Sequence, residues 1–181
     1  MPYRAIVVTG PSAAGKSSFV SDMADKLGWQ VASAGIVWKA EQARLCPDGN
    51  VTVGTFWSHI PRDFFRELYF ELSELARRGG VVIESRYATA MDPRYCLRVS
   101  FDAPERTRVL RAIRRGDFRP DISMAEARAA LRSRLQDEQW VGQRIFGLEN
   151  YTRQPVHVSL NSGMLTREAE VGILLEGLKY E

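Results

Sequence analysis

The sequence predicts an α/β fold in three layers, with a parallel sheet of about five strands between helices on both faces. Short, continuously apolar runs alternate with longer amphipathic segments along the chain, which is the pattern of parallel strands joined by helices. The connections between these segments are short, and the 181 residues suit a single domain, 1–181. A glycine-rich sequence at residues 10–17 joins the first apolar run to the first amphipathic segment.

Boundary signals divide the first half of the chain into elements. Phe19, Met23 and Leu27 recur at helical spacing, and Gly28 follows as a stop. The turn-forming sequence 46–50 ends the second helix. The expected elements are strand 4–9, helix 16–27, strand 30–32, helix 37–45, a helix from Pro61 to Gly79, and strand 81–84, with 51–60 unassigned.

Helix-capping signals divide the second half. Asp102 with Glu105, and Ser123 with Glu126, have the spacing of capping boxes, so we expect a helix after each pair. Thr166 is a third N-cap candidate. The expected elements are strand 96–101, a helix ending near Arg115, helix 124–141, strand 156–160 and a final helix after Thr166.

The composition is that of an ordinary globular domain, with 45% hydrophobic and 26% charged residues. No apolar stretch is long enough to span a membrane and no leader pattern is found, so we expect a cytoplasmic protein without a membrane partner. Cys46 and Cys96 form no metal-ligand pattern and are expected to be reduced thiols. His59 and His157 are expected to be structural or surface residues.

Residues 10–17 have the pattern G-x-x-x-x-G-K-[ST] of a phosphate-binding loop between a strand and a helix. Its backbone N–H groups can converge on one anion, and the following helix directs its positive end to the same point. Lys16 can reach the β- and γ-phosphates, and the Ser17 hydroxyl can bind Mg²⁺. The sequence therefore predicts a P-loop NTPase fold that binds a nucleoside triphosphate. The residues expected to bind it are Gly10, Ser12, Ala13, Ala14, Gly15, Lys16, Ser17 and Ser18.

A carboxylate and further cations are expected beside this loop. Glu84 ends a buried-type strand, where it can join Ser17 in holding Mg²⁺, and Arg86 follows it beside a second anion. Lys39 lies one turn into a helix that follows a short strand, which is a candidate anion site. The residues expected to bind a second substrate, the phosphate acceptor, are Ser33, Gly35, Lys39, Arg86 and Tyr87.

An arginine-rich region at about 111–134 has the pattern of a lid over phosphates. Arg108, Arg111 and Arg115 fall on one helical stripe, so a polyanion or nearby carboxylates should compensate their charges. Arg134 lies on the more buried side of the next helix, with Glu138 one turn further on. Two segments, 46–62 on the acceptor side and 116–124 in the lid, are expected to be mobile.

These parts are the ones that phosphoryl transfer requires, namely a donor loop, acceptor-side cations and an arginine lid. A GTPase switch is not predicted, because N-K-x-D is absent and the D-x-x-G string at residues 25–28 lies at the end of a helix.

The chain resembles the cytidylate kinase-like nucleoside monophosphate kinases, in particular their short archaeal-type branch, over almost its whole length. Residues 33–39 are similar to the family's S-x-G-D-x-F-R, and residues 81–86 to V-V-I-E/D-G-R. Residues 103–115 match A-P-x-x-x-R-x-x-R-x-x-x-R, and residues 134–148 resemble R-x-x-S-E followed by Y-G-I-D. Asn161 lies in a segment similar to the late I-N-T strand.

The resemblance implies that ATP binds residues 10–18 with Arg108 and Arg111, and that a pyrimidine monophosphate binds between Lys39 and Arg86. The implied reaction is Mg²⁺-dependent phosphoryl transfer from ATP to an acceptor such as CMP or dCMP. The cations implied to act on the transferred group are Lys16, Arg111, Arg115 and Arg134.

The acceptor side departs from the family pattern. Ile36 replaces an Asp, Lys39 an Arg and Ser85 a Gly, and residues 141–142 replace Arg-Tyr. Lysine keeps the charge but loses the fork geometry of arginine, so we expect a changed small-molecule acceptor such as a modified CMP-like nucleotide. Two alternatives stay open and rank lower: a kinase for a hydroxyl of a sugar or antibiotic-like metabolite, and a nucleotide-dependent nucleic-acid-binding protein. The sequence predicts no oligomeric state.

Overall fold

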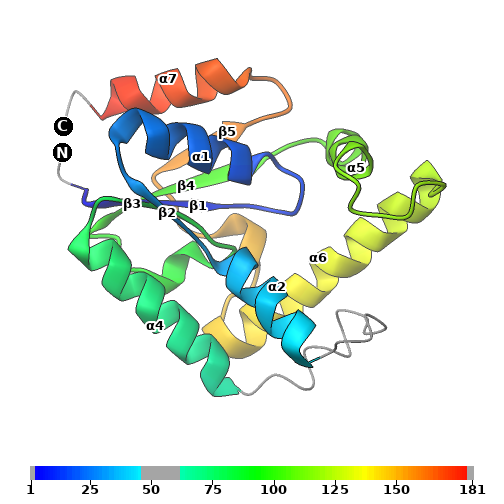
Figure 1. The fold of residues 1–181 in the computed structure, drawn as a ribbon, viewed down its shortest axis with the longest axis horizontal. Helices are drawn as coiled ribbons and strands as arrows, with labels where there is room; N and C mark the ends of the chain where they lie inside the picture. The colour runs from blue at the N-terminus through cyan, green and yellow to red at the C-terminus, as the bar shows by residue number, and fades with distance from the viewer. Residues whose placement is uncertain (1–2, 46–61, 179–181) are drawn as a thin grey trace.

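The computed structural model describes residues 3–45 and 62–178, in which five parallel strands form one sheet with helices on both faces (Figure 1). The strands lie in the order β2-β3-β1-β4-β5, so the predicted α/β fold is confirmed. Their bounds are β1 (Ala5–Thr9), β2 (Gln30–Ser33), β3 (Val81–Glu84), β4 (Cys96–Asp102) and β5 (Val158–Asn161).

The central strand β1 carries the phosphate loop at its carboxyl end. All five of its residues are buried, because strands pair with both of its edges and helices cover both faces. Val8 of β1 pairs with Glu84 of β3, which pairs in turn with Ser33 of β2. The register therefore brings the ends of β2 and β3 to the same edge of the sheet as the loop, where α/β proteins bind their ligands.

Helices bury the two faces of the sheet separately (Figure 1). On one face, Phe19 and Met23 join Phe101 and Leu174 in one apolar cluster. On the other, Phe65, Leu72 and Val141 belong to a second cluster, against which Trp38 packs. The first face is covered by α1 (Lys16–Leu27) and α7 (Arg167–Gly177). The second face is covered by α4 (Arg62–Arg78), the carboxyl half of α6 (Met124–Phe146) and the short helices η1 (Ala88–Ala90) and η2 (Tyr151–Arg153). Helix α2 (Ala34–Leu45) lies beside α4.

The helix α5 (Glu105–Arg114), residues 115–123 and the amino half of α6 form what we call the arm. Val109 of α5 and Leu131 of α6 are buried in a small apolar cluster that also contains Ala13 of the phosphate loop. Because α6 continues without a break into the sheet-face cluster, one helix connects the arm to the core.

Several boundaries differ from the sequence prediction. Helix α2 begins at Ala34 rather than at 37, so Gly35 lies in its first turn. Helix α6 runs on to Phe146, and the last strand is Val158–Asn161 rather than 156–160. The other bounds lie within a residue or two of the prediction, and the caps at Ser123 and Thr166 are confirmed. The predicted turn at 46–50 and the acceptor-side segment up to residue 61 lie outside the described part of the chain, as do Cys46 and His59.

The predicted capping box of Asp102 and Glu105 is wrong. Helix α5 begins after Pro104 and has no side-chain cap. Asp102 is still the last residue of β4, and its carboxylate accepts a hydrogen bond from the Ala103 N–H at 2.8 Å. Glu105 instead pairs with Arg132 across the arm. Within residues 3–45 and 62–178, none of the helices combines the length and apolar character that a membrane crossing requires.

Candidate functional site

The phosphate loop has a constrained backbone. Gly10 has a φ of 133°, and a Cβ at this position would lie 2.0 Å from the carbonyl oxygen of Phe101, so only glycine fits. Ala13 adopts the left-handed conformation at φ 62°, which costs a non-glycine residue about 1 kcal/mol. Gly15, at φ 95°, is the N-cap of α1. Such turns of successive N–H groups before a helix form anion-binding concavities.

Lys16 is buried beneath this loop. Its ammonium donates to the carbonyl oxygen of Pro11 at 2.8 Å, and the residue is 6% exposed. Burial and the nearby charge of Arg86 lower the pKa of Lys16 to about 8, although the Glu84 and Glu138 carboxylates act in the opposite direction. Lys16 is therefore mainly protonated at neutral pH, close to its titration range.

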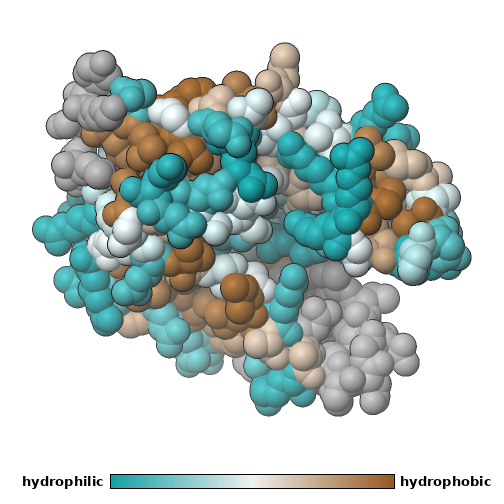
Figure 2. Space-filling model, turned by 45° about the horizontal axis from the view of Figure 1, so that its top comes forward, coloured by the Kyte–Doolittle hydropathy of each residue, from teal (hydrophilic) through white to brown (hydrophobic). Residues whose placement is uncertain are grey.

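A cavity of about 760 Å³ lies between the loop, α2, the end of β3 and the arm, which is the size of a nucleotide or small-metabolite site. Near the centre of Figure 2 the surface is hollowed, and hydrophilic side chains lie along part of its rim. Most of the predicted site residues line this cavity. They are Ser12, Ala13, Gly15, Lys16, Ser17, Ser18, Ser33, Gly35, Lys39, Glu84, Arg86, Tyr87, Arg115 and Arg134.

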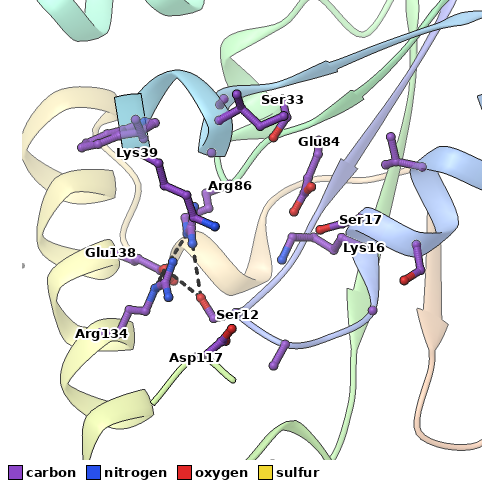
Figure 3. A pocket seen from close by; sticks show the side chains of 18 of the residues that line it. Ser12, Lys16, Ser17, Ser33, Lys39, Glu84, Arg86, Asp117, Arg134 and Glu138 are labelled. Carbon is purple, nitrogen blue, oxygen red and sulfur yellow. Dashed lines mark hydrogen bonds and ion pairs between the residues drawn. The ribbon is translucent and has the colours of Figure 1, made fainter. Parts of the chain in front are cut away.

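Glu138 is the centre of a hydrogen-bond network on one side of the cavity (Figure 3). Its Oε1 accepts from Arg86 Nε at 2.5 Å, from Arg134 Nε at 3.2 Å and from Ser12 Oγ at 3.1 Å. Its Oε2 accepts from the Tyr151 hydroxyl. Burial would raise the pKa of Glu138, but Arg86 and Arg134 outweigh it and hold the pKa below its ordinary value. A buried, ionised carboxylate thus joins the phosphate loop, the end of β3 and α6.

The backbone of Arg86 is fixed as well as its side chain. The Arg86 carbonyl oxygen accepts from Gln154 Nε2 at 2.5 Å and from Thr9 Oγ1 at 2.7 Å. The same Gln154 nitrogen donates to the Tyr151 carbonyl at 2.6 Å, and Gln154 Oε1 accepts from the Thr89 N–H at 3.1 Å. Gln154 therefore ties the segment that follows β3 to η2.

Aromatic side chains close the cavity beneath Arg86. Tyr87 is 1% exposed, stacks on Phe146 with ring centroids 4.5 Å apart, and donates its hydroxyl to the Glu138 carbonyl at 2.8 Å. Ser85, where the family has glycine, donates to the Tyr69 hydroxyl oxygen at 3.2 Å. Tyr87 is thus mainly a core residue whose ring forms part of the cavity wall.

The arm contributes an ion pair to the cavity. Arg115 and Asp117 both line it and bond to each other. The hydrogen bond from Arg115 lowers the pKa of Asp117, and the charges of Arg134 and Lys39 act in the same direction. Residues 115–123 therefore bring both a cation and a carboxylate to the cavity.

Ser17 and Glu84 supply oxygen donors near the Lys16 ammonium (Figure 3). Magnesium is usually held by one or two protein oxygens together with phosphate and water, so this donor pair fits the ion that the family implies. In the part of the chain that the structure describes, no group of three or more His, Cys, Asp or Glu side chains forms a separate metal site.

Four predicted nucleotide-binding residues do not line the cavity. Gly10 and Ala14 lie within the loop itself. Arg108 Nε donates to the Ala103 carbonyl at 3.1 Å. Arg111 donates to the Ser162 side chain and carbonyl at 2.8 and 2.6 Å, next to Gly15. Arg111 therefore lies beside the loop, whereas Arg108 bonds to the segment just before α5.

Carboxylates of the arm pair with several of its other arginines. Glu105 pairs with Arg132 at 2.6 Å and with Arg128 at 3.4 Å. Glu126 pairs with Arg119 at 2.6 Å. Of the stripe predicted from the sequence, Arg115 pairs with the Asp117 carboxylate. Arg108 and Arg111 instead bond to carbonyl and hydroxyl oxygens.

The roles of four residues of the network and the arm are not predicted by the sequence: Glu138, Asp117, Gln154 and Tyr151. The spacing of Arg134 and Glu138, four residues apart on a helix, was a usable signal for one ion pair. The contacts of Gln154 with Arg86 and of Tyr151 with Glu138 join positions 68 and 13 residues apart, and no local pattern encodes them.

Curated relatives match most of the chain. It is 31% identical over 135 residues to a cytidylate kinase of Halobacterium salinarum, covering 72% of this chain and 68% of that protein. It is 28% identical over 170 residues to a cytidylate kinase of Ignicoccus hospitalis, covering 92% of this chain and 94% of the relative. No protein-family model matches the sequence.

Solved structures share the fold. A shikimate kinase from Bacteroides thetaiotaomicron has a TM-score of 0.61 at 19% identity, covering 97% of this chain and 98% of that one. A gluconokinase from Sinorhizobium meliloti has a TM-score of 0.59 at 20% identity, covering 99% and 97%. At these identities the likeness shows the P-loop kinase fold alone, which agrees with the predicted P-loop NTPase fold.

Proposed function

Because the chain belongs to the cytidylate kinase-like family of P-loop kinases, we propose that it transfers the γ-phosphoryl group of ATP to a pyrimidine nucleoside monophosphate related to CMP. An ATP-dependent kinase that acts on a small molecule follows from the family. The monophosphate acceptor and the roles of individual residues are the proposal.

The observation that carries the proposal is the pair of cation groups that share one cavity. Lys16 and the phosphate loop lie on one side, and Arg86 and Arg134 lie on the other, held by Glu138 (Figure 3). A kinase for an anionic acceptor needs two phosphate-binding centres close together, whereas a kinase for a neutral hydroxyl needs one. Arg86 and Arg134 suit the second centre, because guanidinium groups bind phosphate oxygens with two donors.

In this proposal, different residues of the cavity act on different groups of the two substrates. The loop N–H groups and Lys16 hold the β- and γ-phosphates, while Arg86 and Lys39 orient the acceptor phosphate as the attacking group. Arg115 and Arg134 compensate the charge that develops on the transferred group. Ser17 and Glu84 would hold Mg²⁺, which supplies charge neutralisation at the phosphate oxygens when bound.

One observation favours an acceptor that differs from plain CMP. Ile36 is 68% exposed and lines the cavity, at the position where the family pattern has an acid. An apolar side chain there gives up a hydrogen-bond acceptor for polar groups of a substrate. We therefore expect the preferred acceptor to differ from plain CMP at the atoms that face Ile36.

The test is a coupled assay of ADP formation with ATP and Mg²⁺ against CMP, dCMP, UMP, AMP and GMP, with products identified by mass. A nucleoside diphosphate from CMP or dCMP supports the proposal, and weak turnover of both with faster turnover of a base-modified analogue supports the changed acceptor. Nucleotide binding without transfer to any monophosphate would refute the proposal and favour hydroxyl acceptors such as sugars.

A further inference from the structure

We propose that Ser162, in the turn after β5, is a positioning residue for the phosphate loop, and that it is the middle member of a relay of hydrogen bonds from Arg111. This inference concerns nucleotide binding and does not depend on which acceptor the protein uses. Ser162 does not line the cavity, and it would act through the backbone of the loop.

Ser162 is held in place from several sides. It is 3% exposed, and its N–H donates to the Asp102 carbonyl at 2.9 Å. The next residue, Gly163, lies so close to Pro104 that a Cβ would be 2.5 Å from the proline ring. The Asn161 side chain accepts from the Gly163 N–H at 3.0 Å and closes the turn. The turn is thus fixed against the start of α5 before it reaches the phosphate loop.

The Ser162 hydroxyl holds the outer side of one peptide group of the loop. Its Oγ donates to the Ala14 carbonyl oxygen at 2.5 Å, and the Asp102 carbonyl is more distant at 3.2 Å. The peptide bonds of the described residues are trans, so the C=O of Ala14 and the N–H of Gly15 point in opposite directions. Fixing the carbonyl toward Ser162 therefore fixes the Gly15 N–H toward the other side of the loop. Gly15 itself lines the cavity.

Arg111 completes the relay from the arm. Its Nη1 donates to Ser162 Oγ at 2.8 Å, which leaves the serine hydroxyl proton for Ala14, and its Nη2 donates to the Ser162 carbonyl at 2.6 Å. A Cβ at Gly15 would lie 3.4 Å from Arg111 Nη1 and 3.5 Å from Ser162 Oγ, so both groups lie against the loop. An ionised donor strengthens the hydrogen bond that the serine makes in turn.

The experiment is calorimetric titration of the full chain with Mg²⁺·ADP and with tripolyphosphate, a probe that has phosphates but no nucleoside. Loss of one hydrogen bond predicts that Ser162→Ala binds both probes about five- to tenfold more weakly. Ser162→Thr, which keeps the hydroxyl, should restore binding. The matched control is Ser159→Ala, because Ser159 is an exposed serine on the same strand that bonds to Ser100 Oγ at 2.8 Å.

A double-mutant cycle tests the relay itself. Arg111→Lys keeps the positive charge but loses the two-donor fork, and it should weaken tripolyphosphate binding by a similar factor. The double variant should then bind no more weakly than the weaker-binding single variant. The inference would be overturned if the losses of binding free energy in the two single variants added up in the double variant. It would also be overturned if Ser162→Ala bound both probes as tightly as the wild type does. If Ser162→Ala does not fold, the binding of tripolyphosphate by Arg111→Lys decides whether the relay supports the loop. If the wild type binds nucleotide but transfers phosphate to no monophosphate, only the proposed acceptor is overturned.

Discussion

Replacing Glu138 by glutamine is the substitution for which the structure allows the fullest calculation. Glutamine keeps the size of the side chain but removes the negative charge, so Arg86 and Arg134 lose their shared anion. It also places an amide NH₂ beside Tyr151 or the arginines, and the guanidinium groups, which can only donate, cannot accept from it. The folded protein should therefore lose stability, and the anion-binding side of the cavity should lose its geometry.

The magnitude follows from burial. Removing one partner of a fully buried ion pair costs about 3–5 kcal/mol. The Glu138 side chain is 3% exposed, but those of Arg86 and Arg134 are 21% and 37% exposed and keep some hydration, so we take the lower end, about 3 kcal/mol. For a chain of this length each kcal/mol corresponds to about 2–4 °C, which predicts a melting temperature lower by about 6–12 °C.

The assay is urea unfolding of wild type and Glu138→Gln, followed by circular dichroism at pH 7 and at lower pH. The arginines hold the pKa of Glu138 below its ordinary value, so its contribution is present at neutral pH and is lost as the pH falls through the folded-state pKa. The difference in stability between the two proteins should therefore begin to shrink once the pH falls below the ordinary glutamate pKa of about 4.3. Glu149→Gln, at an exposed position just beyond α6, is the control and should change stability by less than about 0.5 kcal/mol. A loss at pH 7 as small as that of the control would refute the reasoning.

Four further predictions concern the phosphate loop and the proposed acceptor side. Lys16→Ala should abolish transfer while leaving the unfolding midpoint nearly unchanged, since its ammonium bonds only to the Pro11 carbonyl among the contacts described; retained turnover would remove Lys16 from the mechanism. Because the pKa of Lys16 is lowered to about 8 and bound phosphate must raise it, ATP binding at pH 8 should take up protons, measured by calorimetry in buffers of different ionisation enthalpy; proton release would contradict this. Arg86→Ala should raise the KM for the acceptor more than the KM for ATP, and the reverse order would place Arg86 on the donor side. Gly10→Ala should weaken ATP binding at least tenfold, because its Cβ would lie 2.0 Å from a backbone oxygen, whereas Gly172→Ala, with open space around it in α7, should have no effect on binding.

The order of elements was predictable because their signals are local. Apolar runs such as Val81–Glu84 form strands, and the Ser123 capping box marks the start of α6. The false capping box at Asp102 shows the limit of such signals. Pairing of β4 with β5 extends through Asp102 and Asn161, so tertiary strand pairing overrides a local helix-start pattern.

The phosphate side of the site was predictable for the same reason, because one continuous motif contains it. The proposed acceptor side is assembled from segments far apart in the chain. Ser12, Arg86 and Glu138 bond to one another across 74 and 126 residues, and only the folded sheet brings them together. Arg111 illustrates the difference, since its helical position was predicted but its bond to Ser162, 51 residues away, was not.

The proposed phosphate-binding cations differ in the charge and burial of the groups that they bond to inside the protein. This difference determines which of them can change partners when nucleotide binds. Lys16 is held by one neutral carbonyl, and Arg115 by a carboxylate at the surface of the arm. Arg86 and Arg134 share a buried carboxylate that also accepts from Ser12. Phosphate can replace a single carbonyl acceptor at little cost, whereas replacing a buried carboxylate leaves an unpaired charge. Lys16 and Arg115 are therefore the groups that can change partners when nucleotide binds, while Arg86 and Arg134 present their remaining N–H donors from fixed positions.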